Sequence, residues 1–224
     1  MATTSSDKMI ELRGLLRERF PEAHRIKPEE EVRDPLETGI RALDQIGVGQ
    51  RQITEIVSPG ESRGAGLVFA SLLRKMASQS RYLALIDARD SFDPQSLGVE
   101  ACRWLFWVRC REIGNAMKAA DWLLRDGNLP HVVLDLQQTP VREIRRLPSS
   151  GWHRLRALVE QTGTTLVVQT PERTIPSAHL RVTLEQDFGL DALDALQSEL
   201  ERNVEANVAR ARFDAETWDG RMSA

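Results

Sequence analysis

The central part of the chain alternates short runs of apolar residues with segments in which apolar residues recur every three or four positions. The runs predict strands, which lie at residues 53–57, 82–86, 104–108, 131–135, 164–168 and 180–184. The helical spacing predicts helices, which lie at about 67–76, 111–125 and 152–161. We expect Gly127 to close the second helix. This alternation is typical of an α/β fold whose mostly parallel sheet carries helices on both faces.

A separate helix is predicted near the N-terminus. Its apolar residues recur at helical spacing up to Pro21, and the stripe includes Leu12, Leu16 and Phe20. A proline-bounded acidic linker at residues 28–35 follows it. Two interpretations stay open: the helix packs on its own domain, or it is an arm that docks on another molecule.

A second apolar stripe lies beyond the last predicted strand and consists of Leu190, Leu193, Leu196, Leu200, Val204 and Val208. It predicts a single helix to about Phe213, on the order of 35 Å long. The stripe either covers its own domain or forms a partner surface, and its length favours a partner. Trp218 either holds a partner or folds back on this helix. The chain thus divides into an arm and linker (1–35), a core (36–184) and a C-terminal helical extension (185–224).

Composition narrows the classes of function. The 224 residues are 41% hydrophobic and 28% charged, which suits one substantial folded domain. The net charge of -3 argues against a protein that coats DNA by overall charge. Cys102 and Cys110 form neither a CxxC motif nor a disulfide framework, and no apolar signal or membrane-spanning segment occurs, so we expect a cytoplasmic protein. The four histidines show no metal-ligand spacing.

The residues between the first strand and its helix have the layout of a phosphate-binding loop. In such a loop, backbone amides hold the phosphates, a lysine reaches the terminal phosphates, and a hydroxyl holds magnesium. Here Ala65 and Gly66 occupy the lysine and hydroxyl positions. The other residues of this degenerate loop are Ser58, Pro59, Gly60 and Gly64. Two carboxylates, Asp87 and Asp135, also fall at carboxyl ends of strands, where α/β sheets bind ligands.

The order of these segments resembles the RecA family of recombinases. Similar features are Thr38-Gly39 and Leu43-Asp44 before the first strand, IDARDSFDP at 86–94, Leu97-Gly98-Val99, and His131 to Asp135 at the position of the Walker B strand. The resemblance covers about residues 36–184. It implies a RecA-like fold and an N-terminal helix similar to the family's protomer-docking arm.

The departures from that family are equally informative. Arg89 stands where active members carry a catalytic glutamate, and the lysine and threonine of the loop are missing. The connections near 147–151 and 170–177 look short beside the family's DNA-binding loops. This combination looks most like the ImuA branch, which is related to the SulA division inhibitors; the segment 105–109, the following helix and HVVLDL are also similar to it.

That resemblance implies a non-enzymatic adaptor in SOS-induced, mutagenic translesion synthesis. The implied partners are ImuB, an inactive Y-family polymerase homologue, RecA or its filament, and an error-prone polymerase. The arm and the rim of the sheet would meet RecA, and the C-terminal extension would hold ImuB. Two alternatives remain: a DNA-dependent ATPase and a SulA-like inhibitor of cell division.

Loss of the lysine argues against ATP hydrolysis. Phosphoryl transfer depends on positioning and charge neutralisation, and removal of a comparable electrostatic group costs about 3–4 kcal/mol of transition-state stabilisation. With Arg89 in place of the glutamate, no base or water-orienting group is visible. We therefore expect no catalytic residue, cofactor or metal, and we interpret Asp87 and Asp135 as caps or ion-pair partners.

One concentrated basic stretch follows the Walker B-like strand and comprises Arg142, Arg145, Arg146, Trp152, Arg154 and Arg156. Arginines with an interleaved aromatic residue suit DNA, but an acidic protein or a solvated helix face gives the same pattern. Of the other tryptophans, we expect Trp104, Trp107 and Trp122 to make core or layer contacts.

Overall fold

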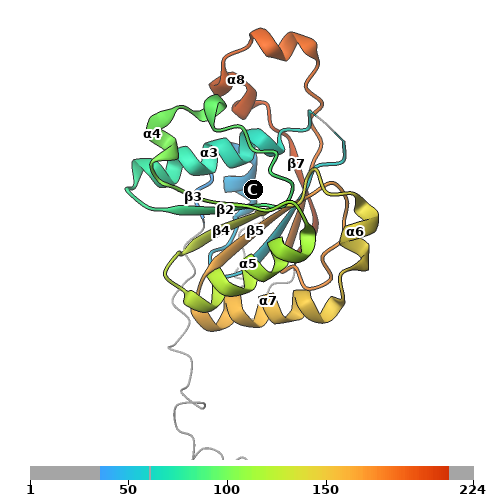
Figure 1. Ribbon diagram of the computed structural model, residues 1–224. Coiled ribbons are helices and arrows are strands. Elements are labelled where there is room, and N and C mark those ends of the chain that lie inside the picture. Colours follow the sequence, from blue (N-terminus) through green and yellow to red (C-terminus); the bar gives the residue numbers. More distant parts are fainter. Residues whose placement is uncertain (1–35, 61, 212–224) are drawn as a thin grey trace, which may run out of the picture. The chain divides into compact units, whose positions relative to one another are not determined.

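The computed structural model describes residues 36–60 and 62–211 of the 224. Their centre is a seven-stranded sheet in the order β3-β2-β4-β5-β1-β6-β7 (Figure 1). The strands are β1 (Ile53–Val57), β2 (Leu83–Asp87), β3 (Leu105–Arg109), β4 (His131–Asp135), β5 (Thr165–Thr170), β6 (Leu180–Leu184) and β7 (Ala206–Ala211). All neighbouring pairs are parallel except β6 with β7. The predicted α/β class and the predicted strands are confirmed, with boundaries within two residues.

Helices cover both faces of this sheet. One face carries α2 (Arg41–Ile46), α3 (Ala65–Ser78) and the short α4 (Val99–Cys102), and the other carries α5 (Ile113–Asp126), α6 (Val141–Arg146) and α7 (Ser149–Thr162) (Figure 1). The remaining elements are the 3₁₀ helices η2 (Pro94–Leu97) and η3 (Leu190–Asp194) and the helix α8 (Gln197–Arg202). Gly127 closes α5 in the left-handed conformation (φ 68°), as expected.

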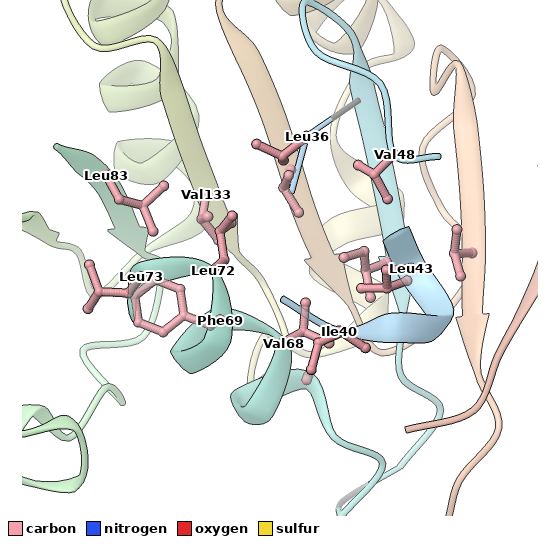
Figure 2. Packing of buried hydrophobic residues seen from close by; sticks show 14 of the residues in the cluster. Leu36, Ile40, Leu43, Val48, Val68, Phe69, Leu72, Leu73, Leu83 and Val133 are labelled. Carbon is pink, nitrogen blue, oxygen red and sulfur yellow. The ribbon is translucent and has the colours of Figure 1, made fainter. Parts of the chain in front are cut away.

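The two faces bury separate apolar clusters. Figure 2 shows α3 presenting Val68, Phe69 and Leu72 to the sheet, beside Ile40 and Leu43 of the preceding segment. All five residues of β1 and all five of β2 are buried. Such continuously buried strands are typical of a parallel sheet covered on both sides.

A buried carboxylate organises the crossover between β5 and β6. Glu55, in the middle of β1, has no exposed surface and pairs with Arg181 on the neighbouring strand. Its Oε1 also accepts hydrogen bonds from the backbone N–H groups of Thr174 (2.8 Å) and Ile175 (3.1 Å) in the crossover. Arg181 in turn donates to the carbonyl of Ile175 at 2.6 Å. Residues 171–179 are therefore held against the sheet face, where Ile175 and Ala178 join the core.

The extension beyond β6 is not the single long helix that its apolar stripe predicts, and that prediction is wrong. The backbone is extended at Ala195 and Leu196, so η3 and α8 are separate short elements. The chain then forms β7, which pairs antiparallel with the otherwise open edge of β6. An uncovered edge leaves backbone N–H and C=O groups unpaired, so tertiary pairing outweighs the helical pattern of this segment.

The residues of that stripe are consequently split between environments. Val204 is buried against the α3 side of the core, whereas Leu190 and Leu196 are 86% and 68% exposed. Leu200 is partly buried. They do not form one partner-binding helix face.

Glu55→Gln should lower the free energy of unfolding by about 3–5 kcal/mol, because it leaves the Arg181 guanidinium buried without its counter-charge. Chemical denaturation measures this change. Glu37→Gln is the matched control, since Glu37 pairs with Lys75 in an exposed position and its loss should leave stability almost unchanged. Equal effects of the two substitutions would contradict the structural role of Glu55.

Two truncated chains test whether β7 contributes to the stability of the sheet. A chain ending at Leu184 loses β7 and buried Val204, and we expect the free energy of unfolding to fall by about 3 kcal/mol or more. A chain ending at Ala211 keeps every described element and should unfold like the full-length protein. If both chains unfold alike in a denaturant titration, β7 does not belong to the cooperative unit.

Candidate functional site

The loop between β1 and α3 joins the end of a buried strand to the start of a helix. It leaves the carboxyl end of β1 and reaches the N-terminus of α3, where Gly64 is the N-cap residue. Gly60 and Gly64 adopt left-handed conformations with φ of 99° and 93°. A Cβ atom on Gly64 would also approach the ring of Phe188 to 3.3 Å. Glycine at position 64 is therefore required by the turn itself, whatever the loop binds.

A cleft runs along the carboxyl edge of the sheet beside this loop. It consists of two adjoining depressions of about 790 Å³ and 1200 Å³, which share Ala65, Gly66 and Gln137 among their lining residues. Apolar side chains of Phe69, Phe92 and Leu97 form much of the wall. The open space thus lies where ligands bind on α/β sheets. The lining mixes these apolar groups with polar ones, and its charged residues are Arg63, Arg89, Asp93 and Asp135.

The cations nearest the loop are engaged with the protein itself. Arg63 donates to the carbonyl of Glu185 (3.0 Å) and lies 3.5 Å from the carboxylate of Asp187. Phe188 completes this contact, since its N–H donates to the carbonyl of Ser62 at 3.0 Å. The segment after β6 therefore holds the loop and neutralises its arginine.

Arg89, which lines the same cleft, is also paired. Its guanidinium contacts the carboxylate of Glu143 on α6 and donates to the carbonyl of Arg111 at 3.3 Å. The side chain lines the cleft, but its charge is balanced by Glu143. An arginine cannot accept a proton from water in this setting, so it supplies no general base.

The two carboxylates at the strand ends act as hydrogen-bond acceptors for backbone turns. Asp87 is fully buried and accepts from the N–H groups of Arg89 (3.2 Å), Ser91 (3.1 Å) and Phe92 (2.9 Å). Asp135 lies beside it in register and accepts from the N–H of Gln137 at 2.8 Å. The interpretation of Asp87 as a cap agrees with these contacts. Burial, and secondly the charge of Asp87, raises the pKa of Asp135 to about 6.

Two glutamines that sequence reasoning missed brace the loop. Gln137, just after β4, donates to the carbonyl of Ser58 at 2.7 Å. Gln169, buried in β5, donates to the carbonyl of Ala65 at 2.8 Å. The only signal in the sequence was a polar amide in or after an apolar strand, because nothing local identifies the carbonyl that it meets. These two hydrogen bonds tie the loop and the first residue of α3 to β5 and to the end of β4.

The basic stretch does not form a stacking surface for DNA bases, which was one of the three interpretations left open by the sequence. Trp152 is a residue of α7, is only 2% exposed and packs in the core, so it cannot stack on bases. Its neighbours are largely paired: Arg145 with Glu172, Arg154 with Asp121, and Arg156 with Glu160. Among the described residues, Arg142 and Arg146 are exposed without an ion pair. The arrangement is that of a solvated, ion-paired helix surface.

The expectations for the other tryptophans are confirmed in part. Trp107 packs against Phe92 with ring centroids 5.2 Å apart, and Trp104 lies 5.2 Å from Tyr82, so both make the expected layer contacts. Trp122 is 71% exposed on α5 and is not a core residue, contrary to the expectation. Several predicted partner residues lie outside the described part of the chain, namely Leu12, Leu16, Phe20 and Trp218, and so does the side chain of Leu193.

Comparison with known proteins adds no family. Neither known protein-family models nor curated protein sequences match this chain. Within residues 36–60 and 62–211, no three His, Cys, Asp or Glu side chains gather to hold a metal ion. In the same residues, no helix has the length and apolar character needed to cross a membrane.

Asp135→Asn should stabilise the protein at pH 7 by about 1–3 kcal/mol, and the gain should disappear below about pH 4. Because the pKa of Asp135 is raised in the folded state, its contribution to stability is complete at low pH and is lost as pH rises through about 6. Asparagine keeps the acceptor for Gln137 and carries no charge. Denaturation of both proteins from pH 4 to 7 measures the difference.

His131 also contributes a pH-dependent term to stability between pH 4 and 7. Burial lowers its pKa to about 4, so its stabilising contribution is lost as pH falls. It is present in both proteins and cancels in the difference between them. A difference that stays constant across this pH range would show that packing, rather than ionisation, distinguishes the variant.

Proposed function

We propose that this protein is a non-enzymatic, RecA-like adaptor of the ImuA type that acts in the cytoplasm during SOS-induced mutagenic translesion synthesis. It would bridge an ImuB-type polymerase subunit and RecA, its filament or the error-prone polymerase. As a pseudo-ATPase, it would use the RecA-like core as a scaffold for protein contacts in the DNA damage response.

The observation that carries the proposal is a phosphate-loop frame without phosphate-binding charge. Ala65 and Gly66 leave the first turn of α3 uncharged, while Arg63 is engaged by Asp187. Catalysis of phosphoryl transfer requires a positioned lysine, a metal and a group that orients the nucleophile. The described cleft supplies a strand-loop-helix turn and two cap carboxylates, which argues for a structural use of the loop.

The crossover after β5 supports a scaffold more than a DNA-binding ATPase. RecA-like recombinases, which the chain resembles, use long loops at corresponding connections to contact DNA. Here residues 171–179 are bound by Glu55 and Arg181, and Ile175 and Ser177 are fully buried. Buried residues cannot reach a nucleic acid without breaking those contacts. Regulation of a partner through surface contacts fits this arrangement better.

Biochemically, the purified protein should hydrolyse ATP no faster than background, with or without single-stranded DNA, in a phosphate-release assay. ATP hydrolysis that DNA stimulates would show that the protein is an enzyme and would overturn the proposed adaptor function. Filamentation of expressing cells, with no change in mutation frequency, would instead favour the division inhibitor.

A substitution in the loop gives the sharper cellular test. Gly66 faces open space at the first turn of α3, so Gly66→Glu should fold while placing a negative charge where a triphosphate would bind. An adaptor that uses no nucleotide should keep its full effect on damage-induced mutation frequency in this variant, as in the matched Gly66→Ala. Loss of the effect in Gly66→Glu alone would indicate that nucleotide binding matters.

A further inference from the structure

β4 begins with a polar residue on the face of the sheet that α3 covers. His131 is the first residue of this strand and is only 3% exposed. Side chains alternate between the two faces of a strand, and Val133 belongs to the apolar cluster of α3 (Figure 2). The imidazole of His131 therefore points to that face, at the amino end of the strand. The cleft lies at the opposite, carboxyl end of the sheet.

This imidazole lacks the partners that a buried polar group requires. Neither ring nitrogen of His131 has a hydrogen-bond partner among residues 36–60 and 62–211. Burial, and secondly the charge of Arg81, lowers the pKa of the ring to about 4, so the ring is neutral at neutral pH. A neutral imidazole carries one donor and one acceptor. Because buried polar groups are nearly always paired, the two unmet nitrogens indicate an occupant beside the ring.

A cavity of about 400 Å³ lies beside the imidazole. Backbone hydrogen bonds hold two parts of its wall, from Leu36 N–H to the carbonyl of Val48 (2.7 Å) and from Arg81 N–H to that of Met76 (2.9 Å). A water molecule takes up about 30 Å³ in the liquid. The cavity therefore has room for a small ligand together with ordered water. Its lining residues are Leu36, Glu37, Gln50, Met76, Gln79, Arg81 and His131.

The charges around this cavity leave one cation uncompensated. Glu37, the acidic residue of the lining, has its Oε2 2.6 Å from the ammonium of Lys75 and accepts from the side-chain amide of Gln79 at 3.2 Å. Its charge is thus already neutralised. Arg81 is exposed and forms no ion pair with any residue that the structure describes. The cavity therefore offers a guanidinium without a counter-charge beside an unpaired imidazole.

This lining favours an anion over a metal ion. A transition metal ion takes neutral imidazole as a ligand, but it also needs further nitrogen, thiolate or carboxylate ligands. The carboxylate of Glu37 is engaged by Lys75, and Arg81 would repel a cation. An oxyanion, in contrast, is attracted by a guanidinium and accepts hydrogen bonds from N–H donors.

We propose that this cavity is a binding site for a small oxyanion, such as a carboxylate or a phosphate group, which lies between Arg81 and His131. Binding takes up one proton from solvent, which adds to the acceptor nitrogen of His131. Both ring nitrogens then donate, to oxygens of the anion or to water that accompanies it. The charged groups that face the ring are Arg81 and, at the mouth, the mutually neutralised Glu37 and Lys75.

NMR titration of the full-length protein with sulfate tests the site. Sulfate keeps its charge between about pH 7 and pH 5, so a pH-dependent affinity comes from the protein. A bound anion raises the pKa of His131, so the ring nitrogens should change from the neutral to the protonated pattern at about pH 6. Affinity should rise as the pH falls, because binding takes up a proton. Sodium chloride at equal ionic strength should leave the ring neutral.

Two arginine variants test whether the anion lies in the cavity. Arg81→Gln should weaken sulfate binding about tenfold or more, because it removes the charge-assisted hydrogen bonds of the guanidinium. Arg142→Gln is the matched control, since Arg142 is likewise exposed but lies on α6, and its loss changes the net charge equally. Equal binding in the two variants, or an affinity that does not depend on pH, would overturn the proposal.

A carboxylate of the chain itself is a second source of the same chemistry, because Asp34 precedes Leu36 by two residues. If sulfate protonates His131 only in Asp34→Asn, the site binds oxyanions and the chain's own carboxylate occupies it. If sulfate leaves the ring neutral in both proteins, the cavity holds only water and the proposal is wrong. Neither result bears on ATP hydrolysis, so this test is independent of the proposed adaptor function.

Discussion

The pairing of Glu55 with Arg181 is the contact on which the described structure depends most. A carboxylate in the middle of a buried strand is tolerated only if every lone pair finds a donor. Glu55 meets this requirement by binding the backbone of residues 174 and 175 and the guanidinium on β6. The crossover from β5 to β6 is therefore held against β1, and one carboxylate links β1 to both of its neighbouring strands, through Thr170 on β5 and Arg181 on β6.

This constraint bears on function because it holds the crossover between β5 and β6 against the core, so that this connection is not a free surface loop. In a sheet whose ligands bind at the carboxyl edge, the loops are the elements free to change. Here the crossover is drawn into the core by Glu55, and the loop before α3 is held by Phe188 from the segment after β6. The carboxyl edge of the sheet is thereby held in place around a cleft whose two arginines are paired with carboxylates, an arrangement that favours protein contacts over phosphate chemistry.

Most charged groups at the carboxyl edge of the sheet also have partners within the protein. Arg63 and Arg89 face acidic groups of the chain itself, and Asp87 is saturated by backbone donors. Asp135 has a single backbone donor beside the Asp87 carboxylate, so burial raises its pKa to about 6. Arginines that already pair with carboxylates of the chain have little to offer a triphosphate, and Asp87 is well suited to hold a turn in place.

The sequence by itself determined the elements whose signal is local: the apolar runs of the six parallel strands, the glycine turn before α3 and the glycine that ends α5. The absence of a lysine after Gly64 is equally local. Tertiary structure decided what depends on distant partners: Trp152 turned inward, Gln137 and Gln169 reached the loop, and the leucine stripe broke to supply β7. Periodicity records which residues are apolar, but only the assembled sheet determines which open edge must be paired.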